Sequence, residues 1–266
     1  MQELITILGS RGMLGQMVKK YFTEKGYQVN CFDQRFGSEG RLEYASYLKN
    51  IRSGYVINCI GKIRQKTDDA GDLLNANALL PAELRNILHP DIALIHPSTD
   101  CIFSGKMGSP YPSDCVSDAE DDYGWSKQLG EVVLQGRLNT LVVRVSIIGP
   151  DNNPGGKGLL AWVKSNPQGS TIKGYTNHLW NGITTLEWCH QVYEFIKKHY
   201  GFPYRVLQLG TKEDYSKYEM LLLFNKIFNL GLTIEPLATP DAVDRRLVPD
   251  KVCKPLTEQL QDLIQL

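Results

Sequence analysis

The first half of the chain alternates short apolar runs with longer stretches in which apolar residues recur every three to four positions. The short runs have the length of strands, and they cover residues 4–8, 27–32, 55–60, 92–96 and 141–148. The longer stretches have the spacing of amphipathic helices, and they cover residues 12–25, 70–88 and 123–135. Because strands that alternate with helices form parallel sheets, the pattern predicts an α/β fold, a Rossmann-type doubly wound parallel sheet between two helical layers.

In the second half of the chain, strand-like and helix-like stretches alternate less regularly. After a break rich in Gly, Pro and Asn at residues 151–158, the pattern predicts a strand at 205–209 and helices at 159–164, 184–199, 217–229 and 255–266. We therefore expect a dinucleotide-binding domain over residues 1–150. A small C-terminal substrate-binding lobe over residues 151–266 would be interleaved with it and close a cleft. The long loop at residues 104–122 is a candidate lid.

Composition excludes several classes of protein. The 266 residues include 29 basic and 29 acidic side chains, so no basic excess is available to bind nucleic acid. No apolar run is long enough to span a membrane, and the N-terminus reaches a glycine turn too early for a signal peptide. The six cysteines form no CxxC pair and the five histidines no HExxH motif, so we expect no metal site. These features favour a cytoplasmic protein with reduced thiols that binds neither nucleic acid nor membranes.

A glycine-rich turn directly follows the first predicted strand and opens the first helix. It reads Gly9-Ser-Arg-Gly12-Met-Leu-Gly15. Glycine lets the backbone turn sharply and approach a pyrophosphate closely, and the helix N-terminus offers free N–H groups and a partial positive charge. In the first strand-to-helix turn of a βαβ unit, this motif predicts dinucleotide binding.

The residues near the expected adenosine ribose give two opposite signals. Asp33 ends the second strand, where a carboxylate can accept a hydrogen bond from the ribose 2′-OH of NAD. Arg11 lies inside the glycine turn and Arg35 follows the strand. Arginines there can pair with the 2′-phosphate of NADP, with Asp33 turned away. Arg35 can equally be a solvated loop charge, so these residues leave both cofactors open.

Two further motifs carry acid–base chemistry. Tyr123 and Lys127 form a YxxxK near the start of a helix, where a separation of four residues places both side chains on one face. A lysine ammonium at this distance lowers the pKa of the tyrosine, so the phenol can act as acid or base toward a carbonyl oxygen. Thr99 follows the fourth strand, where ligands bind in doubly wound sheets, and its hydroxyl can bond the same oxygen.

Taken together, these motifs resemble the extended short-chain dehydrogenase/reductase superfamily. Within it, the chain is most similar to the dTDP-4-dehydrorhamnose reductase family of sugar-nucleotide ketoreductases. The resemblance covers nearly the whole chain and is clearest over residues 1–150. Besides the glycine turn and YxxxK, matching stretches occur in order at residues 56–61 (VINCIG), 77–81 (NALLP), 98–103 (STDCIF), 108–111 (GSPY), 130–131 (GE), 144–149 (RVSIIG) and 182–185 (GITT). The glycine turn also looks like that of GDP-L-fucose synthase, where an arginine in this place helps to hold NADP.

The resemblance implies a role for each candidate residue. Thr99 would orient the substrate carbonyl, Tyr123 would donate a proton as hydride arrives from the nicotinamide, and Lys127 would bond the nicotinamide ribose and tune Tyr123. The pyrophosphate and adenosine side of the cofactor would be held by Gly9, Arg11, Gly12, Met13, Leu14 and Gly15. The remaining cofactor positions are Asn58, Ile60, Gly61 and Asn77. The last of these would support the catalytic geometry.

The chain departs from the family where the sugar nucleotide should lie. Residues 174–184 (GYTNHLWNGIT) replace a run that usually ends in glycine, any residue, proline and threonine. Besides Thr99 and Tyr123, the expected substrate contacts are Ser146, His178, Trp180 and Asn181. For the last three, a packed ring and satisfied polar groups in the small lobe are the alternative. The departure leaves the identity of the sugar nucleotide open.

The function that we expect is reduction of a nucleoside-diphosphate 4-keto-(6-deoxy)hexose in cell-surface polysaccharide synthesis. NADP(H) is the favoured cofactor, NAD(H) is the alternative, and a homodimer is compatible with this function. An epimerase or dehydratase of the same superfamily is a competing interpretation. A dehydratase favours acidic residues directly after the catalytic threonine, and here Asp100 is present without a following Glu. A non-catalytic, cofactor-binding regulatory subunit is the third interpretation. Such proteins tend to lose the tyrosine or lysine of YxxxK, and both are intact here.

Overall fold

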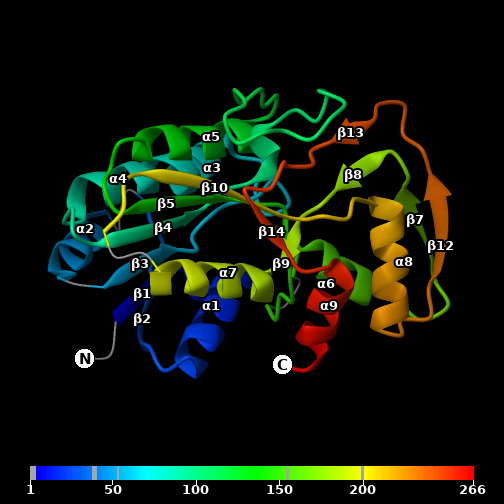
Figure 1. Ribbon diagram of the computed structural model, residues 1–266, viewed down its shortest axis with the longest axis horizontal. Helices are drawn as coiled ribbons and strands as arrows, with labels where there is room; N and C mark the ends of the chain where they lie inside the picture. Colours follow the sequence, from blue (N-terminus) through cyan, green and yellow to red (C-terminus); the bar gives the residue numbers. More distant parts are fainter. Residues whose placement is uncertain (1–3, 38–40, 53, 154–155, 199–200) are drawn as a thin grey trace.

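A seven-stranded, all-parallel sheet forms the centre of the molecule (Figure 1). The computed structural model describes residues 4–37, 41–52, 54–153, 156–198 and 201–266. In spatial order the strands are β14 (Lys251–Cys253), β10 (Arg205–Thr211), β5 (Thr140–Arg144), β4 (Ala93–Pro97), β3 (Tyr55–Asn58), β1 (Leu4–Leu8) and β2 (Gln28–Phe32). The chain runs from β1 to β2 on one side and then to β3 on the other side of β1, so the strand order reverses between β1 and β3, and the carboxyl ends of these strands are the expected ligand edge.

Helices cover both faces of this sheet (Figure 1). One layer consists of α1 (Met13–Glu24) and α7 (Thr185–Lys198). The other contains α2 (Arg41–Asn50), α3 (Ala70–Leu74), the π-helical turn η1 (Asn75–Leu79), α4 (Leu80–Ile87) and α5 (Asp122–Leu134). Successive strand residues serve opposite layers, since Leu94 packs in the α4 and α5 core and Ile95 packs in the α1 and α7 core. This alternation explains why the strands are apolar on both faces.

The C-terminal part builds a smaller lobe at one end of the sheet (Figure 1). Its strands are β7 (Thr171–Tyr175) paired with β12 (Thr233–Leu237), and β8 (His178–Trp180) paired with β11 (Tyr215–Ser216) and β13 (Val243–Asp244). Its helices are α6 (Leu159–Lys164), α8 (Lys217–Ile227) and α9 (Leu256–Ile264). A separate apolar core that includes Trp180, Phe224 and Leu260 holds these elements together. A short pair, β6 (Ile147–Ile148) with β9 (Ile183–Thr184), connects the lobe to the sheet.

The predicted fold class is confirmed, and three element predictions need correction. The predicted helix 70–88 is divided into α3 and α4 by the π-helical turn. Within this turn, the side-chain amide of Asn77 bonds the backbone of Lys62. The predicted strand 141–148 is two strands, since the carbonyl of Ser146 leaves the sheet and accepts from the N–H of Ile183. The helix α2 was not predicted, because most of its side chains are polar and only Tyr44 and Leu48 are buried.

The other elements follow the sequence pattern more closely. The strands of the first half and helices α1, α5, α6, α8 and α9 lie within a few residues of their predicted bounds. The predicted helix 184–199 corresponds to α7, and its last position, residue 199, lies outside the described residues. Strands β10 and β14 join the main sheet from beyond residue 150. The domain boundary at residue 150 stays a prediction.

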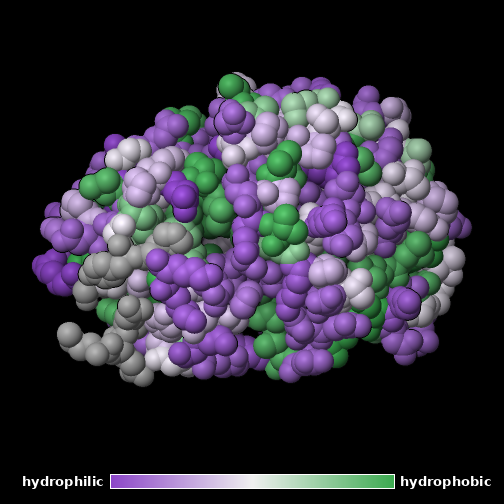
Figure 2. Space-filling view, viewed as in Figure 1, coloured by the Kyte–Doolittle hydropathy of each residue, from purple (hydrophilic) through white to green (hydrophobic). Residues whose placement is uncertain are grey.

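The surface gives no sign of a membrane-spanning segment in the part of the chain that the structure describes. No helix there is long and apolar enough to cross a membrane. On the face drawn in Figure 2, hydrophobic side chains occur in small groups among hydrophilic ones.

Candidate active site

The glycine turn after β1 packs tightly and has a backbone conformation that favours glycine. A Cβ on Gly15 would overlap the carbonyl oxygen of Gly9, so the turn packs tightly on its inner side. Gly9 has a positive φ of 79°, a conformation that L side chains rarely adopt. Gly12 precedes the first residue of α1, and the nearest heavy atom to a Cβ there would be 3.7 Å away. A Cβ at Gly12 would thus be in ordinary van der Waals contact, and the first turn of α1 carries no acidic residue that would repel an anion.

The carboxylate of Asp33 accepts hydrogen bonds from the glycine turn itself. It accepts from the Ser10 N–H at 2.6 Å and from the Ser10 hydroxyl at 2.8 Å. The Arg11 Nε lies 3.4 Å from the same carboxylate, while 83% of the Arg11 side chain is exposed. Arg35 is exposed as well. Asp33 is thus bonded to the turn and paired with Arg11, and both Arg11 and Arg35 present exposed guanidinium groups at this edge.

Asn58, Ile60 and Gly61 lie across from the glycine turn. A Cβ on Gly9 would be 2.7 Å from the Ile60 side chain, so the two loops are in contact. The Asn58 Oδ1 accepts from the Ile60 N–H at 3.3 Å, and its Nδ2 lies 3.2 Å from the Nδ1 of buried His96. These bonds hold the loop after β3 against the predicted cofactor site.

The first turn of α5 presents Tyr123 and Lys127 to the segment that contains Thr99. Asp121 caps this helix by accepting from the Gly124 N–H at 2.8 Å. A Cβ on Gly124 would overlap the carbonyl oxygen of Cys101, so α5 contacts the short helical turn Asp100–Ile102 directly. Thr99 caps that turn through the Cys101 N–H at 3.1 Å. Residues from two distant segments therefore meet at the carboxyl end of β4.

The electrostatics of Tyr123 differ from the expectation. Burial of its hydroxyl raises the pKa of Tyr123 above its usual value, and a bond with the Thr99 hydroxyl only partly opposes this rise. The predicted lowering by Lys127 is not seen, because the Lys127 ammonium donates to the Pro97 carbonyl oxygen at 2.7 Å. Burial also lowers the pKa of Lys127 to about 8, against the attraction of Glu131. The Tyr123 phenol is protonated at neutral pH, but a raised pKa makes it a weaker acid, so a donor role depends on its position beside Thr99.

Asn77 supports the position of Tyr123 through hydrogen bonds with neighbouring residues. It is fully buried, and its Oδ1 accepts from the Lys62 N–H at 2.9 Å. Its Nδ2 donates to the Lys62 carbonyl at 2.9 Å and to the Ser126 hydroxyl at 3.0 Å, and Ser126 in turn donates to the Tyr123 carbonyl. All polar atoms of the Asn77 amide are thus engaged within the protein. This geometry favours a supporting role over direct cofactor contact, which stays a prediction.

A buried ion pair connects the site to the long loop, and the sequence analysis assigned it no role. Arg144 on β5 makes a bidentate contact with Glu131 on α5, with Nη2 and Oε2 2.8 Å apart and side chains only 11% and 7% exposed. The Ser98 hydroxyl also donates to Glu131. Arg144 donates further to the Ser113 carbonyl at 2.8 Å. One network therefore joins α5, the segment before Thr99 and the loop 104–122.

The loop 104–122 is anchored at several points. The Tyr111 hydroxyl accepts from the Gly105 N–H at 3.0 Å, and the ring stacks on Phe103. The Tyr111 N–H donates to the Arg246 carbonyl at 2.8 Å, and Asp118 accepts from the backbone and hydroxyl of Ser104. A lid motion of the whole loop would break these bonds, so the lid role stays a prediction.

The four residues predicted to contact substrate from the small lobe have different environments. His178 is partly exposed and its Nε2 lies 2.8 Å from the Thr239 hydroxyl. Ser146 is partly exposed as well. Trp180 is buried in the core of the lobe, and the Asn181 amide exchanges two bonds with the backbone of Leu247. For Trp180 and Asn181 the geometry favours the alternative, a packed ring and a satisfied amide, and a direct substrate contact stays a prediction.

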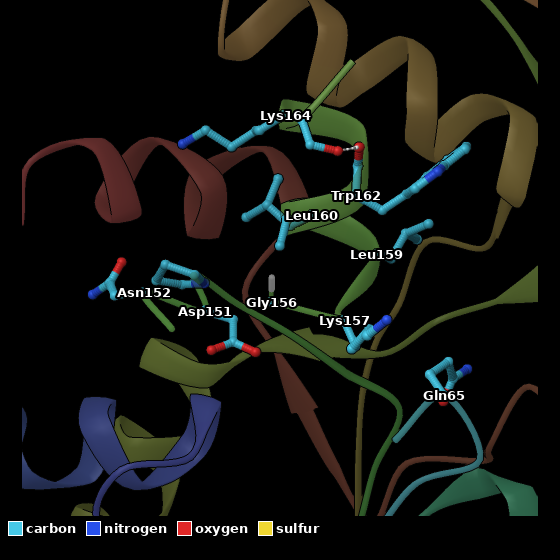
Figure 3. A pocket seen from close by; sticks show the side chains of 12 residues that line it. Gln65, Asp151, Asn152, Gly156, Lys157, Leu159, Leu160, Trp162 and Lys164 are labelled. Atoms are coloured by element: carbon cyan, nitrogen blue, oxygen red, sulfur yellow. Dashed lines mark hydrogen bonds between the residues drawn. The ribbon is translucent and has the colours of Figure 1, made fainter. Parts of the chain in front are cut away.

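A cavity of about 910 Å³ lies where α6 approaches the dinucleotide-binding part (Figure 3). Asp151 and Lys157 line it from the loop after β6, Trp162 from α6, and Gln65 from the loop after β3. Gly158 caps α6, and a Cβ there would be 3.4 Å from the sulfur of Met13 at the start of α1. The start of α6 therefore lies next to the start of α1.

These features define the class of the protein. A doubly wound sheet with a glycine turn, and a Thr–Tyr–Lys set at the carboxyl end of β4, are the arrangement of an extended short-chain dehydrogenase/reductase. The family model described as the RmlD substrate binding domain matches residues 1–160. The chain belongs to this family, the dTDP-4-dehydrorhamnose reductase-like proteins.

Individual relatives agree with this family. A probable dTDP-4,6-dihydroxy-2-methyloxan-3-one 4-ketoreductase from Streptomyces antibioticus is 32% identical over 150 residues, which are 54% of this chain and 50% of that protein. The match therefore spans half the length of that relative. The dTDP-4-dehydrorhamnose reductase from Bacillus anthracis in complex with NADP has a TM-score of 0.83 at 16% identity, covering 100% of this chain and 99% of that one. The UDP-glucose 4-epimerase from Thermotoga maritima with UDP-glucose has a TM-score of 0.78 at 16% identity, covering 98% of each chain. At these identities the two structures show the common fold alone.

Proposed function

We propose that the protein reduces the 4-keto group of a nucleoside-diphosphate hexose with NADPH. The observation that carries this proposal is the position of the Tyr123 phenol beside the Thr99 hydroxyl at the carboxyl end of β4. Such a phenol is protonated at neutral pH, which suits reduction of a ketone because the product oxygen must receive a proton. The relatives' names point to the same substrate class.

Different residues of the chain would perform different steps of this reaction. Bound NADPH would supply the hydride that forms the new C–H bond at C4. Thr99 would donate to the carbonyl oxygen and orient it, and Tyr123 would transfer its proton to that oxygen to give the alcohol. The Lys127 ammonium, close to Tyr123 on the same helical face, would stabilise the phenolate left behind and bond the nicotinamide ribose. Gly9, Gly12 and Gly15 would seat the pyrophosphate on the N-terminus of α1.

Several finer points belong to the same proposal. The cofactor is NADP(H) because Asp33 is engaged with Ser10 and Arg11 is exposed beside it. The protein acts in the cytoplasm, where nucleotide sugars would be its substrates, and a homodimer is compatible with its surface. No contact in the structure names the base or the sugar.

A spectroscopic assay tests the proposed reaction directly. Purified protein would receive NADPH or NADH together with enzymatically generated 4-ketohexoses on dTDP, UDP, GDP or CDP. Consumption of NADPH with one of these substrates, at a rate proportional to enzyme, is the expected result. Conversion of a sugar nucleotide to an isomer without net NADPH consumption would favour the epimerase instead. Cofactor binding without turnover of any substrate would favour the regulatory subunit.

The cofactor preference has its own test in Arg11. Arg11→Met removes the exposed guanidinium beside Asp33, so we expect the KM for NADPH to rise about tenfold and the KM for NADH to stay unchanged. That size corresponds to the loss of one charge-assisted hydrogen bond to the 2′-phosphate. Arg52→Met, an exposed arginine after α2, is the matched control. An equal rise in KM for NADPH and for NADH would show that Arg11 does not recognise the 2′-phosphate.

A further inference from the structure

Glu131 lies one helical turn after Lys127 on the buried face of α5. Both residues are buried, and side chains four residues apart on a helix are neighbours. The reaction proposed above uses Lys127 and leaves Glu131 without a role. A buried carboxylate next to a catalytic ammonium is costly to maintain unless it has a task there.

The two side chains bind consecutive residues of the segment that leads from β4 to Thr99. The Lys127 ammonium donates to the Pro97 carbonyl at 2.7 Å, and the Ser98 hydroxyl donates to the Glu131 carboxylate. Ammonium and carboxylate are therefore held side by side at the carboxyl end of β4, directly before Thr99.

Arg144 fixes the Glu131 carboxylate from the other side. Its Nε lies 3.1 and 3.0 Å from the two carboxylate oxygens, and its Nη2 lies 2.8 Å from Oε2. Arg144 is itself held in place, because its Nη1 donates to the Ser113 carbonyl at 2.8 Å. The carboxylate cannot rotate away from Lys127 without breaking these bonds.

The neighbour of Lys127 on β4 is His96, and its hydrogen bond requires a neutral ring. His96 is fully buried, and its Nδ1 lies 3.2 Å from the Nδ2 of Asn58. An amide nitrogen can only donate, and the Asn58 Oδ1 already accepts from the Ile60 N–H, so the Nδ1 of His96 is an unprotonated acceptor. Burial and the charge of Lys127 also hold the pKa of His96 well below its usual value.

The remaining ionisable groups around Lys127 and Glu131 are two tyrosines. Tyr123 lies one turn before Lys127, and burial raises its pKa. Burial likewise raises the pKa of Tyr204, which lies near Glu131, to about 12. Both phenols are neutral where a lysine loses its proton in this site, since burial lowers the pKa of Lys127 to about 8. Among the described residues, Glu131 is the charged group that opposes this lowering.

A buried ammonium loses its proton more readily than one in water, so its charge depends on a fixed neighbour of opposite sign. We propose that Glu131 is a positioning residue for Lys127, a fixed counter-charge that keeps the ammonium available to the cofactor ribose and to the Tyr123 phenolate. Ser98 and Arg144 hold the carboxylate in place for this task. The inference rests on the proposed function, because it places Glu131 behind the same catalytic set.

The pH dependence of NADPH binding tests this assignment without requiring turnover. Isothermal titration calorimetry on the full chain, across the range in which lysine titrates, gives the Kd at each pH. For the wild type, the Kd should be constant at low pH and rise above about pH 8, as Lys127 loses its proton. Glu131→Gln should move this midpoint about one pH unit lower, a usual effect of removing a close opposite charge. Arg144→Met should move it higher, because Glu131 then acts on Lys127 without being neutralised.

The opposite directions separate this role from a purely structural one. Both substitutions break the same buried ion pair, so a general loosening of the fold would move the two midpoints alike. Lys127→Met should abolish the pH dependence. Glu120→Gln, which removes an exposed charge, should leave the midpoint unchanged.

Three results would overturn the inference. They are a wild-type midpoint in Glu131→Gln, midpoints of Glu131→Gln and Arg144→Met that move in the same direction, and a pH dependence that Lys127→Met retains. Glu131→Asp guards against misfolding, since it keeps the charge and should bring the midpoint back toward the wild-type value. If Glu131→Gln does not fold, Arg144→Met still decides, because an upward shift requires the negative charge of Glu131 beside Lys127.

The same titrations distinguish this inference from the proposed function. If NADPH binds with the expected shifts but no 4-ketohexose is reduced, the role of Glu131 stands and the proposed reductase activity fails. If a 4-ketohexose is reduced and the midpoints do not shift, the reductase stands and the role of Glu131 fails.

Discussion

Replacing Tyr123 by phenylalanine should lower kcat by a factor of roughly 10²–10⁴, the usual contribution of a positioned general acid. The substitution removes only the hydroxyl, and with it the hydrogen bond between Tyr123 and Thr99. Because the phenol is not part of the glycine turn, the Kd for NADPH should stay within about twofold of the wild-type value. Steady-state kinetics with the substrate found in the panel, and a fluorescence titration with NADPH, measure both quantities.

A second tyrosine provides the control for this experiment. Tyr193 lies on α7 in an aromatic group with Tyr21 and Phe22, on the opposite face of the sheet from α5. Tyr193→Phe keeps that packing and should retain full activity. If Tyr123→Phe turned over substrate as fast as Tyr193→Phe does, Tyr123 would not be the proton donor, and the reaction would need another acid.

Replacing Glu131 by alanine should lower the free energy of unfolding by about 3–5 kcal/mol, the typical cost of breaking a buried ion pair from one side. The bidentate partner Arg144 would stay buried without a counter-charge, and the Ser98 hydroxyl would lose its acceptor. For a chain of this length the expected drop in Tm is roughly 6–20 °C. Thermal and urea unfolding followed by circular dichroism give both values.

An exposed ion pair is the matched comparison. Lys106 and Glu120 are 2.7 Å apart, with side chains 65% and 57% exposed, in the same long loop that Arg144 contacts. Glu120→Ala should change the free energy of unfolding by less than about 1 kcal/mol, because water screens an exposed pair. An equal loss in the two variants would mean that burial does not strengthen the Glu131–Arg144 pair.

Part of the site could be predicted from the sequence because its signals are local. The glycine turn needs residues without a side chain at fixed spacing, and the structure shows the reason in the overlap that a Cβ on Gly15 would cause. Tyr123 and Lys127 lie one helical turn apart, so their relation follows from helix geometry alone. The strands that flank these motifs are buried on both faces, and their continuous apolar runs predict a parallel sheet.

The remainder depends on contacts between residues that are far apart in the sequence. Glu131 and Arg144 lie on different elements, and only the packing of α5 against the sheet brings their side chains together. The Asn77 amide bonds Lys62 and Ser126, which are distant from it in the sequence, and its expected place at the cofactor stays a prediction. In the same way, Trp180 packs in the core of the lobe, and the Asn181 amide donates to the backbone carbonyl of Leu247.

The sequence by itself determined the fold class, the order of the strands along the chain and the catalytic set Thr99, Tyr123 and Lys127 as a hypothesis, since each depends on spacing or on local backbone conformation. Only the tertiary structure decided the direction in which the pKa of Tyr123 shifts. The YxxxK spacing predicts a lowered pKa, but the surrounding protein removes water from the phenol and raises it, while Lys127 turns to the Pro97 carbonyl. Desolvation is the sum of contacts from many distant segments, and no short stretch of sequence contains it.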